Sequence, residues 1–475
     1  MAGSVQGSPG FDLQPSSEQV ALSSNYITNF DFLNQYLPDT YEKEFERYGN
    51  RTVASFLRLV GAEMPSNSDL IKWAEQGRLH TKYVDVECAV GAASAATWTI
   101  GDVLKPGSGS IAVRVGQTVM LTRNTGGANL KALVTAVDTA AGTVVLAYYG
   151  ADHVGVVADV YTMFIYGSEF KKGTPGMVGS LEADDVFFEN KPIILKDRYA
   201  VSGSDMAQIG WVEVTTENGA SGYLWYLKSE HETRLRFDDY LETSMLEAVP
   251  AIQNSGAAAA LGNAGAANTG AGSEGIFYVV NQRGNVWSGG NPNVLGDFDS
   301  IIQRLDKQGS IEENVIFVDR QFGFDIDDML AAQNSYGAGG TSYGLFDNDQ
   351  EMALNLGFTG FRRGYDFYKS DWKYLNDPTM RGGLPSGSGS GRINGLMVPA
   401  GSTSVYDQIL GKNAKRPFLH VRYRASETED RRYKTWITGS AGGAQTSSLD
   451  AMEVNFLSER AVCTLGANNF FIFEE

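Results

Sequence analysis

The sequence predicts an α+β protein, and three observations carry that prediction. Residues 84–166 alternate apolar and polar side chains between glycine-rich turns, which is typical of a small β-barrel or sandwich. Residues 222–249 form the clearest helical pattern in the chain. After residue 276, strand and helix patterns alternate, which indicates a further α/β or α+β domain.

Composition excludes several classes of protein. The chain has 475 residues and a net charge of −18, so a face that grips nucleic acid is not expected. It contains no apolar run of the roughly 18 residues that a membrane span needs. Its first residues lack the basic and apolar regions of a signal peptide. Cys88 and Cys463 are too few and too far apart for a disulfide framework.

The first 221 residues divide into four parts. Residues 1–30 are rich in Ser, Gln, Gly and Pro, and they predict an extended arm without a core of its own. A helical pattern follows from Phe32 to His80, with a second short helix starting at Ser68–Trp73. The β-rich segment follows. Lys191–Leu195 and Ile209–Thr216 are then expected to be strands of a long hairpin.

The helix expected at Gly222–Val249 is long, about 42 Å at 1.5 Å per residue, and Pro250 ends it. Asp238 and Glu242 interrupt its apolar side, so we interpret it as a rod between other elements. Leu235 and Met245 are expected on its packed side, and the two acids are expected to meet neighbouring molecules.

The rest of the chain combines loops with shorter elements. Residues 254–275 are a low-complexity loop, and residues 382–391 form a second flexible joint. The expected elements are strands at Ile276–Val280 and Val315–Val318, a helix at Phe298–Lys307, and C-terminal strands at 419–423, 453–465 and 470–473.

No catalytic, cofactor-binding or metal-binding residue is predicted. Gly270, Gly272 and Gly275 match a dinucleotide fingerprint only as a string, because they precede the expected strand instead of following one. Asp325–Asp328 lacks the spacing of a calcium loop, and it is interpreted as the acidic first turn of a helix. His231 stands alone on the long helix, without a partner for nucleophilic catalysis.

Two segments, 362–374 and 412–434, combine basic and aromatic residues. Such enrichment occurs at nucleic-acid sites and at protein interfaces. Because acidic residues interleave both segments, we interpret them as subunit interfaces.

The order of these parts resembles the major capsid proteins of tailed double-stranded DNA bacteriophages, which have the Hong Kong ninety-seven-type fold. Within this family, the sequence most resembles the shell proteins of crass-like and marine phages. Three passages carry the likeness: Asn190–Ser204 leading to the long helix is similar to the extended loop before the spine helix, Ile301–Gly309 with Asn314–Phe317 looks like the apical-domain core, and Val454–Ala461 with Asn468–Phe470 looks like the closing strand of the peripheral domain.

The resemblance implies six parts, with the β-rich module as an insertion. They are an N-terminal arm and helices (1–83), the inserted module (84–166), the extended-loop hairpin (167–221), the spine helix of the peripheral domain (222–253), the apical domain with Gly/Ala-rich loops (254–391), and peripheral-domain strands with the C-terminus (392–475).

The resemblance also implies a structural function and no enzymatic activity. The chain would assemble with itself into hexamers and pentamers of an icosahedral shell. That shell would enclose packaged DNA without binding it specifically, in a virion built in the cytoplasm of a bacterial host. Portal, scaffold and minor or decoration proteins would be further partners, and no cofactor or membrane is expected.

Three alternatives stay open. An encapsulin-type nanocompartment shell shares the fold. A surface-layer or extracellular β-rich binding protein would need a signal peptide. A polysaccharide-active enzyme would need paired carboxylates in a cleft.

Overall fold

The computed structural model describes most of the chain, in several stretches. They are residues 5–6, 12–13, 62–78, 80, 82–90, 95–101, 111–150, 159–179, 185–207, 214–215, 221–222, 225–261, 271–309, 311–334, 359–385, 391–407, 412–443 and 445–475. The predicted arm and the helix expected before residue 61 therefore lie almost wholly outside the described residues.

The chain divides into two compact units. One consists of Met1–Arg51, Arg198–Arg234 and Ile437–Val454, and the other of Thr52–Asp197, Leu235–Trp436 and Asn455–Glu475. The fold is α+β, as the sequence predicts.

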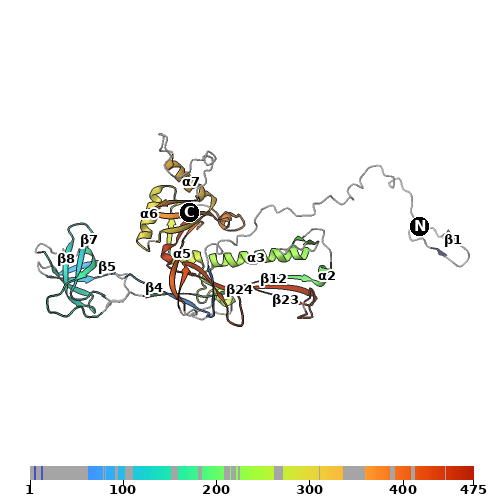
Figure 1. Cartoon of the computed structure of the whole chain (residues 1–475), viewed down its shortest axis with the longest axis horizontal. Helices are drawn as coiled ribbons and strands as arrows, with labels where there is room; N and C mark the ends of the chain where they lie inside the picture. The colour runs from blue at the N-terminus through green and yellow to red at the C-terminus, as the bar shows by residue number, and fades with distance from the viewer. Residues whose placement is uncertain are drawn as a thin grey trace. The chain divides into compact units, whose positions relative to one another are not determined.

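Six antiparallel strands in the second unit close into a barrel in the order β10-β5-β6-β9-β8-β7 (Figure 1). Their bounds are β5 Lys82–Val90, β6 Ala95–Ile100, β7 Gln117–Arg123, β8 Leu130–Asp138, β9 Thr143–Tyr148 and β10 Val160–Ser168. Alternate side chains fill its interior, among them Trp98, Leu121 and Leu146, which are fully buried. The strands expected between residues 84 and 166 are thus present.

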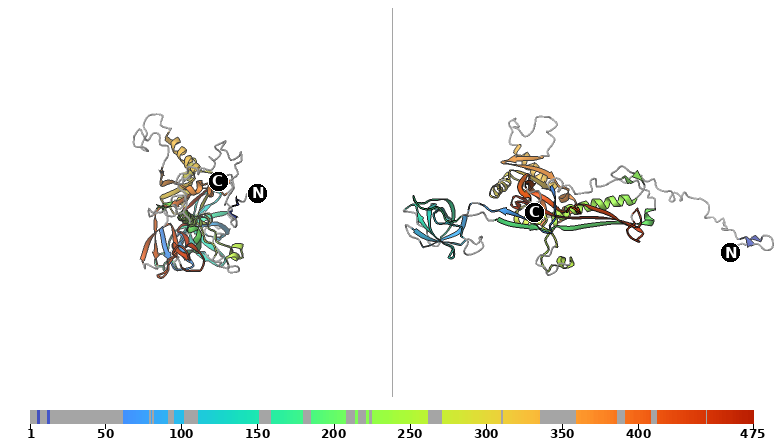
Figure 2. Two further views of the ribbon diagram at one scale, coloured as in Figure 1. Left: turned by 90° about the vertical axis from the view of Figure 1, so that its right-hand side faces the viewer. Right: turned by 60° about the horizontal axis from the view of Figure 1, so that its bottom comes forward.

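The barrel segment lies between two strands that pair with each other. These are β4 (Ile71–Gln76) and β11 (Asp185–Asn190), which form an antiparallel two-stranded ribbon (Figure 2). The helix expected to start at Ser68–Trp73 is therefore wrong. Ile71, Trp73 and Glu75 alternate with more exposed residues at the period of two that a strand requires.

A five-stranded sheet contains β12 (Ile193–Ser202), β24 (Ala451–Thr464), β22 (Leu419–Arg424) and β3 (Ala62–Ser66) in that order, with β23 (Lys434–Gly439) also paired to β24. The hairpin expected between Lys191–Leu195 and Ile209–Thr216 is not formed within the described residues. The sheet neighbour of β12 is β24, and β13 (Val214–Thr215) pairs with β14 (Ser221–Gly222).

The long helix is present as α3 (Trp225–Glu247), and its 23 residues span about 34 Å. It starts three residues later than expected because Ser221–Gly222 belongs to β14. In the second unit its buried side chains include Phe237, Leu241 and Met245. Leu235 is only half-buried.

Glu242 corrects the expectation that both acids of this helix face neighbouring molecules. Its side chain is 4% exposed within this single chain, so it lies on the packed side of α3. Asp238 is half-buried.

A mixed six-stranded sheet has the order β15-β25-β19-β16-β18-β17. The strand bounds are β15 Asn285–Ser288, β16 Glu313–Val318, β17 Gly360–Arg363, β18 Tyr365–Asp371, β19 Ile393–Pro399 and β25 Phe471–Glu474. Ile316 and Val318 pack with helices α6 (Leu295–Asp306) and α7 (Arg320–Asn334). The intervening Phe317 packs in a separate cluster, so the sheet is buried on both faces.

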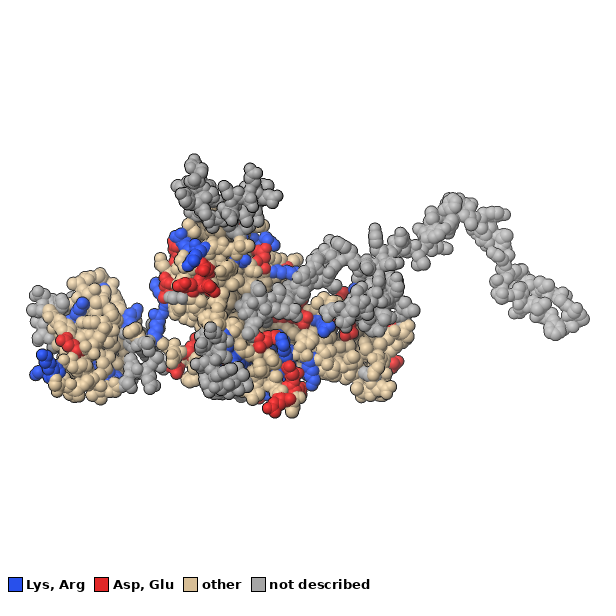
Figure 3. Space-filling model, in the orientation of Figure 1, with Lys and Arg blue, Asp and Glu red and all other residues tan. Residues whose placement is uncertain are grey.

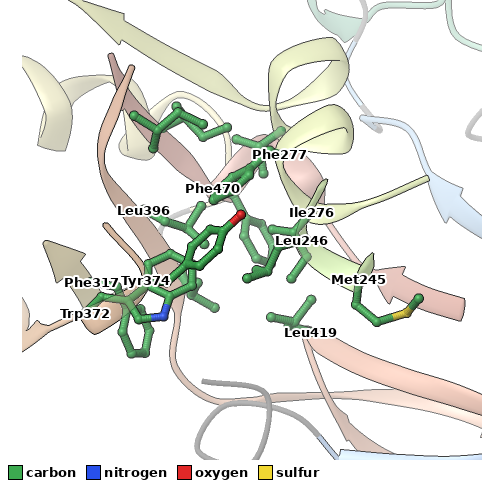
Figure 4. Close-up of a cluster of buried hydrophobic side chains, with 14 of the residues drawn as sticks. Met245, Leu246, Ile276, Phe277, Phe317, Trp372, Tyr374, Leu396, Leu419 and Phe470 are labelled. Atoms are coloured by element: carbon green, nitrogen blue, oxygen red, sulfur yellow. The ribbon is translucent and has the colours of Figure 1, made fainter. Parts of the chain in front are cut away.

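Helix α5 (Ile276–Arg283) contributes Ile276 and Phe277 to that second cluster, which also contains Trp372 and Leu419 (Figure 4). The strand expected at Ile276–Val280 is therefore wrong. Short apolar runs fit a buried strand and a buried helix equally well.

The remaining elements are short. They are β1 (Val5–Gln6) paired with β2 (Asp12–Leu13), α2 (Gly203–Met206), α4 (Gly256–Ala260), α8 (Lys373–Asn376), β20 (Ser402–Asp407) paired with β21 (Lys412–Pro417), and the 3₁₀ turns at Arg381–Gly383 and Ala467–Asn469. Among the described helices, none has both the length and the apolar character needed to cross a bilayer.

The barrel has its own buried cluster, which includes Tyr83, Trp98 and Met163. We predict that residues 78–179 fold when expressed alone and give a β-type circular dichroism spectrum with a cooperative thermal transition. Replacing Trp98 by Ala should abolish that transition, whereas replacing exposed Val115 by Ala should not. A disordered spectrum of the unmodified segment would contradict this.

Phe237 is fully buried, and its ring centroid lies 5.4 Å from that of Tyr433 and 5.7 Å from that of Phe456. Phe237→Ala should lower the free energy of unfolding of the unassembled subunit by about 3–5 kcal/mol in urea titrations. Tyr240→Ala is the matched control, because Tyr240 is 46% exposed on the same helix.

Glu242→Lys should also lower the free energy of unfolding of the subunit, because the Glu242 side chain is buried. An unchanged unfolding midpoint for Glu242→Lys would restore its assignment to an interface.

Candidate assembly surfaces

The acidic segment Asp325–Asp328 does not form a cation site. Helix α7 begins at Arg320, so these residues lie within the helix and not in its first turn as expected. Asp325 accepts hydrogen bonds from Asn291 at 2.7 Å and Gln321 at 3.0 Å, and Asp327 pairs with Lys369 at 2.6 Å. Within the described ranges, no group of three or more His, Cys, Asp or Glu residues could hold a metal ion.

The glycines of the Gly270–Gly275 string have a packing role. Gly270 lies outside the described residues. A Cβ on Gly272 would come within 2.3 Å of the Val249 carbonyl oxygen, and one on Gly275 within 2.7 Å of the Ala248 backbone. These glycines let the chain pass close to the end of α3. The Gly275 N–H also donates to the Ala248 carbonyl, so it is not available to a phosphate.

The segment 362–374, interpreted from the sequence as an interface, alternates buried and exposed side chains. Its aromatic residues Tyr365, Phe367, Trp372 and Tyr374 are buried. Its cations pair within the chain: Arg362 with Asp366, Arg363 with Asp299, and Lys369 with Asp327. Tyr368 is the exposed exception among its aromatic side chains.

Several cations of the segment 412–434 also form ion pairs within the chain. Arg424 pairs with Asp69, Arg431 with Glu459, and Arg432 with Glu63. His420 is buried, and burial together with the nearby Arg422 lowers its pKa to about 4, so it is neutral at pH 7. His231 is exposed on α3.

The ribbon of β4 and β11 is fixed at its base by Asn190. This side chain is buried, and its Nδ2 donates to the carbonyl oxygens of Glu274 at 3.0 Å and Val462 at 2.6 Å. Its Oδ1 accepts from the backbone N–H groups of Lys191 and Glu274, both at 2.8 Å, and from the Ser273 hydroxyl at 3.0 Å. One amide thus joins β11, the entry to α5 and strand β24.

Arg283 holds the inner face of the ribbon. Its guanidinium lies 4.3 Å from the ring centroid of Phe188 and 6.0 Å from that of Trp73. It also pairs with Glu274 at 2.8 Å. Burial raises the pKa of the Glu274 carboxyl, and the charge of Arg283 opposes that rise. The cation–π contacts attach the ribbon to helix α5, and the ion pair holds Arg283 to the segment before that helix.

The outer face of the ribbon exposes one large apolar side chain. Phe187 is 71% exposed and lies opposite Ala74. On one side of it Lys72 and Glu189 form an ion pair at 3.1 Å, and on the other side Asp185 lies opposite Gln76. A single exposed phenyl ring within a polar frame is the arrangement of an interface anchor.

The sequence analysis did not single out Phe187 or Arg283, and it named Asn190 only as the start of the passage similar to the extended loop. The run Val186-Phe187-Phe188 before Asn190-Lys191-Pro192 is a strand signal that could have located β11. Nothing local in the sequence indicates its partner β4, which lies more than a hundred residues earlier.

Asn190→Ala should weaken the base of the ribbon, because it leaves buried backbone donors and acceptors without partners. We expect a loss of about 3 kcal/mol in the free energy of unfolding, and faster amide hydrogen exchange in β4 and β11. Gln76→Ala, at the exposed end of the ribbon, is the control and should change neither. Exchange rates that match the parent protein would show that Asn190 does not hold the ribbon.

Comparisons with known proteins give matches among solved structures only, since no family model and no curated protein matches. A structure from Microbacterium phage Oxtober96 has a TM-score of 0.39 at 9% identity, covering 94% of this chain and 99% of the other. The capsid of an empty GTA particle has a TM-score of 0.36 at 7% identity, covering 96% and 99%. An encapsulin complex from Synechococcus elongatus has a TM-score of 0.32 at 10% identity, covering 62% and 77%.

The chain is similar to phage capsid proteins. Capsids of a cyanophage and of bacteriophage PhiM1 are also among the similar structures.

Proposed function

We propose that this chain is the major capsid protein of a tailed phage. It assembles with itself into hexamers and pentamers of an icosahedral shell that encloses packaged double-stranded DNA. Its function is structural and not enzymatic. The observation that carries the proposal is the anchored ribbon with Phe187 exposed on its outer face.

The physical reason lies in the weakness of two-stranded ribbons. Such a ribbon is marginally stable in water by itself, and Asn190 and Arg283 stabilise only its base and inner face. Burying the exposed phenyl ring against another molecule would contribute about 2–3 kcal/mol per contact. Repeated around a ring, one such heterologous contact per subunit closes a symmetric assembly.

The charge of the chain supports enclosure of DNA without specific binding. With 56 acidic and 38 basic residues, the protein repels the phosphate backbone. Acidic and basic side chains are interspersed on the face shown in Figure 3.

Residues 1–30 hold neighbouring subunits together in this proposal. Portal, scaffold and decoration proteins are further partners of a virion made in the bacterial cytoplasm.

Purified protein tests the proposal by size-exclusion chromatography with light scattering, followed by electron microscopy. Capsomers or hollow polyhedral particles are expected. A monomer that persists at all concentrations would refute the proposal. Particles from an infected or expressing cell should contain nuclease-resistant DNA. Protein cargo in its place would favour an encapsulin-type shell.

Phe187→Ser should leave the thermal transition of the subunit within about 1 °C of the parent, because the ring is exposed. It should reduce the yield of particles in sedimentation by at least roughly tenfold, since each subunit loses an anchor. Phe187→Leu is the matched control, because it keeps an apolar side chain and should assemble. Normal assembly of Phe187→Ser would show that the ribbon is not an interface.

A further inference from the structure

Arg304 differs from most arginines of the described residues in having a neutral partner. Its Nε donates to the Asn285 side-chain oxygen at 3.0 Å. By contrast, Arg283, Arg363 and Arg381, among many others, each bind a carboxylate. No ion pair found in the described part of the chain neutralises Arg304.

The residue that binds Arg304 is a buried, uncharged amide. Asn285 is 1% exposed, and its Nδ2 donates to the carbonyl oxygens of Asn468 at 2.6 Å and Phe470 at 3.1 Å. Its Oδ1 also accepts from Gln308 at 2.9 Å. The buried Asn285 amide therefore orients the Nε side of the Arg304 guanidinium, and no ion pair among the described residues compensates its charge, which lowers the entropy cost of binding an anion.

Two further cations lie at the same place. Lys307 follows the end of α6, and the guanidinium of Arg78 donates to its main-chain carbonyl. Lys307 and Arg304 line a depression of about 350 Å³ together with Ser300, Gln303 and Gln308. Apart from the two cations, its lining carries hydroxyl and amide groups and no acid.

The helix dipole explains only part of this arrangement. Cations near the C-terminus of a helix are stabilising, which accounts for Arg304 and Lys307 as sequence choices. It does not account for Arg78, which comes from the segment after β4, or for the buried amide that orients Arg304. Two cations that line a polar depression, with Arg78 bonded to the main chain of one of them, form a receptor for an oxyanion.

We propose that this depression binds carboxylate side chains of a second copy of this chain. The inference rests on the proposed function and names one contact of the shell. Carboxylates are the anion that the chain itself supplies in excess, with 56 Asp and Glu against 38 Lys and Arg. Nucleic acid is the weaker choice, because these few cations cannot offset the repulsion from a net charge of −18.

The test compares assembly of the parent protein with that of the double variant Arg304→Gln and Lys307→Gln. Light scattering should show assembly slowed roughly tenfold at low ionic strength, with the difference shrinking in high salt as charges are screened. Both side chains are exposed, so the thermal transition should stay unchanged. The matched control is Arg362→Gln, which removes an exposed arginine that already pairs with Asp366 of its own chain. It should assemble at the parent rate.

Each other outcome overturns the inference in a recognisable way. If the parent forms particles and the double variant assembles equally fast at every ionic strength, the depression is not a contact, and the proposed function stands. If the parent never self-associates in sedimentation, the proposed function and this contact fail together. If the variant assembles normally but loses affinity for a single-stranded DNA oligonucleotide in fluorescence anisotropy, the anion is nucleic acid and the second copy is excluded.

Discussion

In the ribbon of β4 and β11, each strand has only the other as a hydrogen-bonding neighbour. The geometry of the ribbon therefore depends on the contacts that hold its base. That requirement is met by Asn190, whose side-chain amide makes five hydrogen bonds in a buried site, and by Arg283, which covers Phe188 and Trp73. These contacts tie the ribbon to α5 and β24, which belong to the main hydrophobic clusters. The exposed face of the ribbon can then present Phe187 in a defined direction.

Contacts between distant segments also balance the charge of the chain. An acidic chain destabilises its compact state by self-repulsion, and the described residues offset this with ion pairs between distant segments. Glu63, for example, pairs with Arg432 and Arg460, and Glu247 pairs with Arg381. Cations left without carboxylates, such as Arg304, therefore stand out as candidates for contacts outside the chain.

Elements with strong local patterns could be predicted from the sequence. The helix α3, the helix α6, the strand β16 and the long strand β24 all lie within a few residues of their expected positions. Elements whose conformation depends on contacts with distant parts of the chain could not be predicted in this way. Ile276–Val280 is a helix whose preceding residue, Gly275, packs against the end of α3, and Ile71–Gln76 is a strand that pairs with the distant β11. The candidate site was missed for the same reason, since Asn190 acquires its role only from Glu274 and Val462.

The insertion of the barrel between paired strands has an evolutionary consequence. The chain enters the barrel along β5 and leaves it along β10, and these two strands are hydrogen-bonded neighbours, so the ends of the segment lie close together. A segment with adjoining ends and its own core can be deleted, enlarged or exchanged without redesigning its host. Selection can therefore remodel the barrel while leaving the ribbon base intact, and a foreign domain with adjoining termini could be grafted in its place.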